Sequence, residues 1–277
     1  MDIHERARRF RALHAPGELL LLPNAWDAVS ASIFAGAGFA AVATTSSGVA
    51  AALGHPDGER APRDAIVAAV GRIAAAVDVP VSADIESGFG ADARAVGETV
   101  RRIAAAGAVG VNLEDVVHPE PRLYALPEAA ARVAAARAAA DAEGVALFVN
   151  ARTDAFSFHP GDLQARFDEA VRRAHAFVEA GADGVYVMDT GAGASVIGRL
   201  AAAIPAPLNV MSVPGLPDRA GLRALGVRRV SLGPRAMSAT MGYLRALARA
   251  MVDADVFVPE APAWMSYAEI NALFARK

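Results

Sequence analysis

The 277-residue sequence contains no cysteine. Disulfides, cysteine-ligated zinc, iron–sulfur clusters and thiol nucleophiles are therefore excluded. The sequence also lacks any charge-free run of roughly 18 apolar residues, which argues against a membrane-spanning helix. The opening segment, MDIHERARRF, is charged, and no apolar core of a signal peptide follows it. From these absences we expect a soluble, cytoplasmic protein.

Positive charge is not in excess either. Lys and Arg together number 27 and Asp and Glu number 30, so the formal net charge is −3. A nucleic-acid partner calls for a basic surface, so this class of partner is disfavoured. The hydrophobic fraction of 54% excludes a disordered chain and is sufficient for a large core. We therefore expect a small-molecule partner, and neither nucleic acid nor membrane.

Short runs rich in Val, Leu and Ile alternate along the chain with Ala-rich helical stretches that end at glycine, for example at Gly107 and Gly181. Eight of these runs are predicted strands: Leu19–Pro23, Ala40–Thr45, Pro80–Asp84, Gly110–Glu114, Val145–Ala151, Gly184–Met188, Pro207–Met211 and Arg228–Leu232. Their nearly continuous apolar character is typical of strands buried on both faces. Eight strand–helix units in about 250 residues predict an α/β fold, namely a (β/α)8 barrel of the TIM type.

An open, doubly wound sheet is the alternative fold. Such a sheet usually has fewer strands and a glycine-rich first turn, where this chain has Pro23-Asn24-Ala25-Trp26-Asp27. The strand–helix pattern ends at Val252, so we expect one barrel domain, residues 1–252, and a tail, residues 253–277. The tail has a predicted helix near Ser266–Arg276 and apolar residues such as Trp264 and Tyr267. We expect it to pack on the barrel or on a neighbouring subunit.

Charged residues stand where neighbouring predicted strands end. Asp84 and Glu86 end the third strand, Glu114 ends the fourth and Arg152 follows the fifth. The carboxyl ends of barrel strands form the rim where chemistry takes place. Carboxylates gathered at one rim repel each other unless they share a cation or a proton, and oxygen ligands without Cys or His suit Mg²⁺ or Mn²⁺. Arg152 offers a planar fork for a substrate carboxylate.

Several polar residues have simpler interpretations. A strand-end Asp often caps the next helix, and we expect this of Asp27 and Asp154. The segment Thr44–Ser47 is either an ordinary loop or a loop whose backbone N–H groups bind an oxyanion. Four histidines have no evident partner in the sequence and are expected at the surface: His4, His14, His159 and His175.

The motifs of this chain resemble those of the isocitrate lyase/phosphoenolpyruvate mutase superfamily. The resemblance covers about residues 20–250, in family order and spacing. The motifs that carry it are Pro23-Asn24-Ala25-Trp26-Asp27, Thr45-Ser46-Ser47-Gly48-Val49-Ala50, Gly54-His55-Pro56-Asp57, Ser82-Ala83-Asp84-Ile85-Glu86-Ser87-Gly88-Phe89-Gly90, Asn112-Leu113-Glu114-Asp115 and Ala151-Arg152-Thr153-Asp154-Ala155.

The resemblance implies a (β/α)8 barrel whose last helix is swapped between paired subunits, usually within a homotetramer (a dimer of dimers). It also implies Mg²⁺ or Mn²⁺ as the cofactor. Family members bind or make a 2-oxo acid on this metal, and they cleave or form the neighbouring C–C or C–P bond through an enolate-like species.

Roles carried over by position follow from the same resemblance. Asp84 corresponds to the main metal carboxylate, and Glu86 and Glu114 correspond to supporting ligands that act through water. Asp57 matches the acidic residue of the loop after the second strand, and Arg152 matches the substrate-carboxylate arginine. The expected substrate contacts are Trp26, Thr45, Ser46, Ser47, Arg152 and Asn209.

Three departures separate this chain from the lyases of the superfamily. Their Lys-Lys-Cys-Gly-His loop after the fourth strand, which carries the catalytic Cys, is replaced here by a segment that contains His118 and no cysteine. The usual Asp-Ala-Asp is Asp84-Ile85-Glu86, and the usual Ser-Gly-Gly is Thr45-Ser46-Ser47. His118 either replaces the missing acid/base, because imidazole titrates near neutral pH, or is a solvated loop residue.

Two functions remain open from the sequence. The first is a Mg²⁺-dependent lyase or hydrolase of a small 2-oxo acid, or of a hydroxy acid that yields one. Candidate reactions are oxaloacetate decarboxylation or hydrolysis, weak 2-methylisocitrate-type cleavage and phosphonopyruvate hydrolysis, with Asp57, Glu114, Arg152 and His118 as catalytic candidates. The second is a protein that binds a 2-oxo acid with little or no turnover. Both functions need the metal site, so the carboxylates alone do not separate them.

Overall fold

A computed structural model describes residues 2–119, 121–191, 193–253 and 264–275. Nine parallel strands form one sheet in the order β1-β11-β10-β9-β8-β5-β4-β3-β2. Their bounds are β1 Leu20–Leu22, β2 Asn24–Ala25, β3 Val42–Thr44, β4 Val81–Asp84, β5 Gly110–Glu114, β8 Phe148–Thr153, β9 Gly184–Val187, β10 Leu208–Met211 and β11 Arg229–Ser231. A separate antiparallel pair consists of β6 Val116–Val117 and β7 Arg122–Leu123.

The barrel closes at Pro23, which divides the first predicted strand into β1 and β2. β1 pairs with β11, whereas β2 pairs with β3. The Asn24 side chain bridges this seam: its amide N–H donates to Thr44 O, and its Oδ1 accepts from the N–H groups of Leu232 and Gly233. The nine segments therefore make an eight-strand barrel, and the predicted (β/α)8 fold is confirmed.

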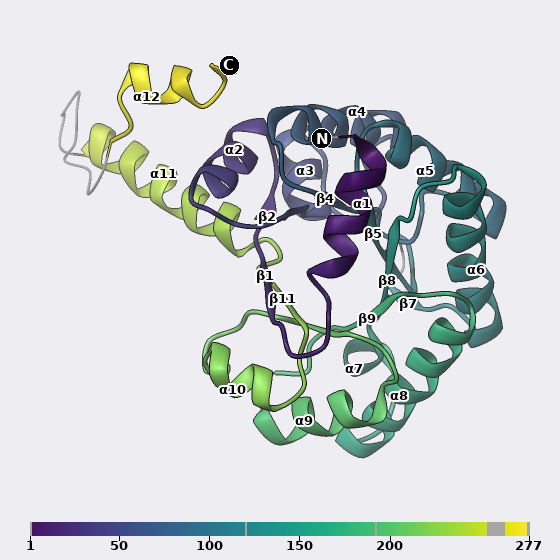
Figure 1. Cartoon of the computed structure of the whole chain (residues 1–277). Helices are drawn as coiled ribbons and strands as arrows, with labels where there is room; N and C mark the ends of the chain where they lie inside the picture. The colour runs from purple at the N-terminus through teal and green to yellow at the C-terminus, as the bar shows by residue number, and fades with distance from the viewer. Residues whose placement is uncertain (1, 120, 192, 254–263, 276–277) are drawn as a thin grey trace.

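Helices surround this sheet (Figure 1). Their bounds are α1 Ile3–Ala12, α2 Ala28–Gly36, α3 Ser46–Ala52, α4 Arg63–Ala76, α5 Ala93–Ala105, α6 Leu126–Ala142, α7 Ala155–Phe158, α8 Leu163–Glu179, α9 Ala194–Ala203, α10 Arg219–Ala224, α11 Arg235–Asp253 and α12 Tyr267–Ala272. None of the helices in the described part of the chain has both the length and the apolar composition needed to cross a bilayer.

α1 lies across the end of the barrel opposite the candidate site and packs on its interior (Figure 1). The Phe10 ring contacts Phe148 edge to face, with 5.8 Å between ring centroids. A Cβ atom at Gly110 would lie 2.6 Å from Phe10 Cε1, so this strand position has room only for glycine. His14, expected at the surface, is instead buried and stacks on Phe148 at 4.0 Å between ring centroids.

Two further expectations need correction. The strand predicted as Val145–Ala151 lies at Phe148–Thr153, because Leu147 O accepts hydrogen bonds from Arg11 and Arg137 before the strand begins. Asp27 caps α2 as expected, but the carboxylate of Asp154 makes no capping hydrogen bond to α7.

α11, the eighth barrel helix, projects away from the ring of helices (Figure 1). It has no buried residue. α11 ends one residue beyond the predicted domain boundary, and part of the predicted tail lies outside the described residues. The predicted tail helix exists as α12, and it starts at a capping box of Ser266 and Glu269. Trp264 and Tyr267, expected to be packed, are 61% and 85% exposed on this single chain.

Candidate active site

The carboxyl end of β4 supplies the first carboxylate, Asp84. Its backbone N–H donates to Thr44 Oγ1 at 2.8 Å, which fixes the end of β4 against β3. The N–H of Ser46 donates to Asp84 Oδ2 at 3.2 Å. Burial raises the pKa of Asp84 to about 6, and the Arg152 charge only partly offsets this effect. Asp84 is therefore a carboxylate that lacks sufficient positive charge around it.

Glu86 follows Asp84 by two residues, in the loop after β4, and is buried. Its backbone is left-handed, with φ of 49°. The N–H of Glu59 donates to Glu86 Oε2 at 2.5 Å, while the buried Oε1 has no hydrogen-bond partner. Burial and, secondarily, the charges of Asp84 and Asp57 raise the pKa of Glu86 to about 8, against the effect of the Glu59 hydrogen bond. A cation beside Oε1 would remove this cost.

A second group of side chains lies at the ends of β5 and β8, where Glu114 and Arg152 are register partners. Arg152 Nη1 lies 2.9 Å from Glu114 Oε2, and Arg152 also forms a two-point ion pair with Asp154, at 2.8 and 2.7 Å. His118 Nε2 lies 2.6 Å from Glu114 Oε1. Two carboxylates thus face one guanidinium and one imidazole.

The pKa shifts in this second group reflect that pairing. Burial alone would raise the pKa of Glu114, but the Arg152 charge and the His118 hydrogen bond hold it below its ordinary value. Burial opposes charge on His118, yet the hydrogen bond and charge of Glu114 raise its pKa. Burial raises the pKa of Asp154 to about 6 despite Arg152. The pairing with Glu114 therefore favours the protonated form of His118.

A cavity of about 110 Å³ lies between the two groups. It is lined by Ser46, Asp57, Glu86, Glu114, Val116, His118, Pro121, Arg152, Asp154 and Phe158. A water occupies about 30 Å³ in the liquid, so the space accommodates only a few heavy atoms. A hollow of about 160 Å³, lined by Gly58, Glu59, Arg60, His118 and Pro119, adjoins the cavity at His118.

Metal binding can be tested against this geometry. In the described residues, no three acidic or histidine side chains are arranged so that they alone could hold a metal ion. Both oxygens of Glu114 are already engaged, by His118 and by Arg152. Asp84 and the unpartnered Oε1 of Glu86 do fit a cation, provided that most of its ligands are water and substrate oxygens, as Mg²⁺ commonly requires.

The structure also places the segment Thr45–Ser47. Thr45 is the N-cap of α3, and its Oγ1 lies 3.2 Å from Ser47 Oγ. The segment is therefore the start of a helix and not a loop. The N–H of Ser46, which the sequence suggested as free for an oxyanion, donates to the carboxylate of Asp84.

Four expected substrate contacts are not among the residues that line the cavity, namely Trp26, Thr45, Ser47 and Asn209. Trp26 lines a different hollow, beside α2 and α3, together with Val29 and Leu53. Asn209 is fully buried inside the barrel: its amide N–H groups donate to Ser231 Oγ and Val210 O, and its Oδ1 accepts from Asn150. The side chain of Asn209 therefore has no group directed at the cavity.

Sequence reasoning missed three residues of the site. Asp154, interpreted as a helix cap, pairs with Arg152. Glu59 holds the loop of Glu86, and Arg132, buried on α6, binds the carbonyls of the same loop. Only Glu59 gave a usable signal, since it is an acidic residue two positions after Asp57 in the loop between two strand–helix units.

Comparison with known proteins agrees with this arrangement. The sequence profile of the phosphoenolpyruvate phosphomutase family matches residues 10–252. An uncharacterized protein of Mycobacterium tuberculosis is 36% identical over 263 residues, which are 95% of each chain. The crystal structure of a putative phosphonomutase from Burkholderia cenocepacia has 42% identity and a TM-score of 0.85, covering 90% of this chain and 99% of that one.

Two further relatives have named chemistry. The 2-methylisocitrate lyase of Salmonella typhimurium is 35% identical over 192 residues, which are 66% of this chain and 62% of that enzyme. A phosphonopyruvate hydrolase crystallised with oxalate and Mg²⁺ has 28% identity and a TM-score of 0.84, covering 97% and 94% of the two chains. With its barrel, its acidic rim and the family match over most of its length, the chain belongs to the phosphoenolpyruvate phosphomutase family, within the superfamily of carbon–carbon lyases and mutases that also contains isocitrate lyase.

Proposed function

We propose that the protein is a Mg²⁺- or Mn²⁺-dependent lyase or hydrolase of a small 2-oxo acid, or of a hydroxy acid that yields one. The observation that carries this proposal is the pair Asp84 and Glu86, whose carboxylates lack compensating charge. Glu86 lines the cavity of about 110 Å³, as does Ser46, which donates to Asp84. The relatives that act on small carboxylic acids support the same class of substrate.

The chain's own groups have distinct tasks in this proposal. Asp84 and Glu86 would hold the metal, with Asp57 and Glu114 reached through water. When bound, the metal would polarise the 2-oxo group and favour cleavage of the neighbouring bond. Arg152 orients the substrate carboxylate by its planar fork, at the expense of part of its pairing with Glu114 or Asp154. Ser46 positions Asp84 and lines the cavity, while Thr45 and Ser47 flank it at the start of α3.

His118 is the proposed proton donor in place of the missing Cys. Its Nε2 lies on Glu114, and its ring lies between the cavity and the adjoining hollow. A Cβ atom at Gly58 would lie 3.0 Å from His118 Nδ1, so the glycine lets the ring pack against the loop. This position is suited to protonating the fragment that leaves the 2-oxo acid.

Two other mechanisms or roles can be compared with this one. A lysine Schiff base is unavailable in the barrel, because residues 1–252 contain no lysine. A protein that binds the acid without turnover remains the second candidate. The ion pairs of Arg152 with Glu114 and Asp154 favour it, since they already occupy the guanidinium that would bind the substrate carboxylate.

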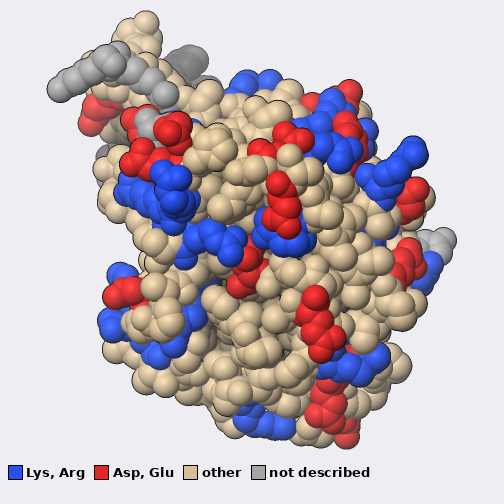
Figure 2. Space-filling model, turned by 45° about the vertical axis from the view of Figure 1, so that its right-hand side comes forward, with Lys and Arg blue, Asp and Glu red and all other residues tan. Residues whose placement is uncertain are grey.

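A nucleic-acid partner is not proposed, since basic and acidic side chains are interspersed on the face seen in Figure 2. The cytoplasmic location stays a prediction.

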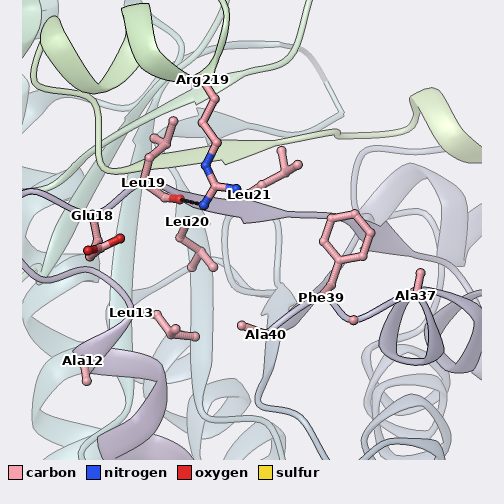
Figure 3. A pocket seen from close by; sticks show the side chains of 11 residues that line it. Ala12, Leu13, Glu18, Leu19, Leu20, Leu21, Ala37, Phe39, Ala40 and Arg219 are labelled. Carbon is pink, nitrogen blue, oxygen red and sulfur yellow. Dashed lines mark hydrogen bonds between the residues drawn. The ribbon is translucent and has the colours of Figure 1, made fainter.

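We also propose that α11 is exchanged between paired subunits, within a homotetramer. On the single chain this helix exposes Met241, Leu244 and Met251, and it leaves Leu21 of β1 39% exposed. A groove of about 420 Å³ runs over this uncovered part of the barrel, between α1, β1 and α2 (Figure 3). The α11 of a second copy would bring an apolar face to this groove.

The first experiment measures ligand binding by calorimetry with oxalate, in the presence of Mn²⁺ and then of EDTA. Because the oxalate oxygens would serve as ligands of the bound metal, we expect oxalate to bind at least about tenfold more tightly with Mn²⁺ than with EDTA. Oxalate affinity that EDTA does not change would contradict the proposal.

The second experiment compares turnover of oxaloacetate, isocitrate and 2-methylisocitrate on one preparation with Mg²⁺. A positioned acid contributes about 10² to 10⁴ in rate, so cleavages that relied on the loop Cys should be slower than oxaloacetate decarboxylation. Slower turnover of isocitrate would show that His118 replaces the Cys only in part. Turnover of isocitrate as fast as that of oxaloacetate would show full replacement, and His118→Ala should then abolish it. Oxalate binding without any turnover would favour the binding protein.

A further inference from the structure

Glu59 joins the two loops that carry the uncompensated carboxylates. It belongs to the loop after α3, together with Asp57, and its contacts all lie on the loop after β4. Its N–H donates to Glu86 Oε2 at 2.5 Å. Its Oε1 accepts from Ser87 Oγ at 2.7 Å and from the N–H of Phe89 at 2.6 Å. Glu59 thus forms hydrogen bonds both with the side chain of Glu86 and with the residues that follow it.

Arg132, on α6, binds the same loop. Its Nη2 donates to Ser87 O at 3.0 Å and to Gly90 O at 2.6 Å, and its Cζ lies 4.3 Å from the centroid of the Tyr124 ring. Glu59 thus accepts from two donors of the loop, and Arg132 donates to two of its carbonyls.

The backbone of this region is strained, which explains the need for such contacts. Glu59, Glu86 and Phe89 all have positive φ, at 56°, 49° and 57°. Residues other than glycine rarely adopt this backbone conformation, and they keep it only where several surrounding contacts hold it in place. The contacts of Glu59 involve all three of these residues. Without them, the loop would be expected to relax and to move the carboxylate of Glu86.

We propose that Glu59 is a positioning residue that fixes Asp57 and Glu86 relative to each other, so that the rim binds its divalent cation with Glu86 already in place. This inference rests on the proposed function. We assign Glu59 no direct contact with the metal, since its Oε1 is committed to Ser87 and Phe89. It acts through the geometry of Glu86.

The test compares Mn²⁺ affinity, by calorimetry, of the parent with Glu59→Ala and Glu59→Gln. Loss of a residue that orients a ligand typically weakens metal binding 10- to 100-fold, and we expect this of Glu59→Ala. Glu59→Gln keeps one acceptor oxygen and should be intermediate. Glu98→Ala is the matched control, since Glu98 is an exposed acid that pairs only with Arg101 among the described residues, and it should bind like the parent.

Folding is checked by circular dichroism at the temperature of the titration, and Glu59→Gln decides the outcome if Glu59→Ala does not fold. A purely structural role would lower the melting temperature and leave Mn²⁺ affinity unchanged, which would overturn the inference. Faster hydrogen exchange at the Phe89 amide in Glu59→Gln would support the contact in solution. Failure of the parent itself to bind Mn²⁺ would instead contradict the proposed function.

Discussion

Arg152 illustrates how much one side chain decides at this rim. Its guanidinium lies between Glu114 and Asp154, and its Cζ lies 5.7 Å from the centroid of the Tyr186 ring. The fork that the sequence assigns to a substrate carboxylate is thus occupied by two carboxylates of the protein. A ligand must compete with at least one of them, so binding depends on the shape of the fork as well as its charge.

Replacing Arg152 with Lys should therefore weaken oxalate binding at least about tenfold, because lysine keeps the charge but loses the bidentate geometry. Calorimetry with Mn²⁺ and oxalate measures this change. Arg137→Lys is a matched control: Arg137 also pairs with two acids, Asp141 and Asp183, and has 19% side-chain exposure against 17% for Arg152. Equal oxalate affinity in the two variants would show that the Arg152 fork is structural.

His14 shows the limit of sequence reasoning at the same scale. Nothing in its neighbourhood along the chain predicts a partner, yet it is buried between Phe10 and Phe148 and donates from Nδ1 to Phe10 O at 2.9 Å. Burial and then the Arg229 charge lower its pKa to about 3. Its burial depends on which barrel end α1 covers, and this is a tertiary property.

Acid should consequently destabilise the fold through His14. With a folded pKa of about 3 and an ordinary value of 6.5, the unfolded state binds the proton first as the pH falls. The stabilising contribution of neutral His14 is therefore complete above pH 6.5 and is lost toward pH 3, at about 1.4 kcal/mol per pH unit. Urea unfolding at several pH values measures it.

His14→Phe keeps an aromatic ring on Phe148 but removes the titration, so its free energy of unfolding should fall less steeply with acid than that of the parent. His4→Gln, on the exposed side of α1, should follow the parent. Parallel curves for the parent and His14→Phe would mean that His14 already carries its proton in the folded state.

Among the site residues, those at strand ends were the most predictable from the sequence. Asp84, Glu114 and Arg152 lie at a common rim because parallel strands end together, and their strand positions follow from apolar patterning. The apolar patterning does not predict which of these side chains pair with one another. Glu114 pairs with Arg152 and His118, and Glu86 Oε1 is left without a hydrogen-bond partner. These pairings depend on how far side chains reach across loops of irregular conformation.

At the scale of elements, each of the eight predicted strands has its counterpart, and the errors fall at the ends. The ladder of β8 continues to Thr153 because both of its neighbours supply partners as far as Glu114 and Val187. The small polar residues of Thr44–Ser47 predict a loop, either ordinary or oxyanion-binding, because such residues are typical of loops. The same residues suit a helix start, where unpaired N–H groups meet a carboxylate, here that of Asp84.

α11 is the element whose sequence fits its surroundings least on a single chain. Met241, Leu244 and Met251 recur at helical spacing on one side and are all exposed. Such a stripe normally faces a core. The other barrel helices meet this expectation on their own sheet, whereas the stripe of α11 has no partner surface within the described chain. This exposed stripe is the reason for the proposal that a second copy of the chain covers α11.

At the scale of the whole molecule, the exchange of α11 predicts a dimer or tetramer in solution, measurable by light scattering. Leu244→Glu places a charge in the apolar stripe and should lower the average mass toward that of the 28.5 kDa chain. Ala246→Glu adds the same charge on the opposite side of the helix and should leave the mass nearer to the parent value.

The exchange would be contradicted if the parent behaves as a monomer at micromolar concentration. It would also be contradicted if Leu244→Glu keeps the mass of the parent while circular dichroism shows it to be folded.

In the part of the chain that the structure describes, α1 covers the end of the barrel opposite the carboxyl rim (Figure 1). Phe10 and His14 fill the interior on Phe148, and the bare backbone of Gly110 lets them approach closely. Under the proposed function, a small acid would therefore reach Glu86 and Arg152 from the carboxyl rim, past His118 and Pro121. The product of the proposed reaction would leave by the same route. The site would then have to empty before the next substrate binds, and accumulated product would compete with substrate.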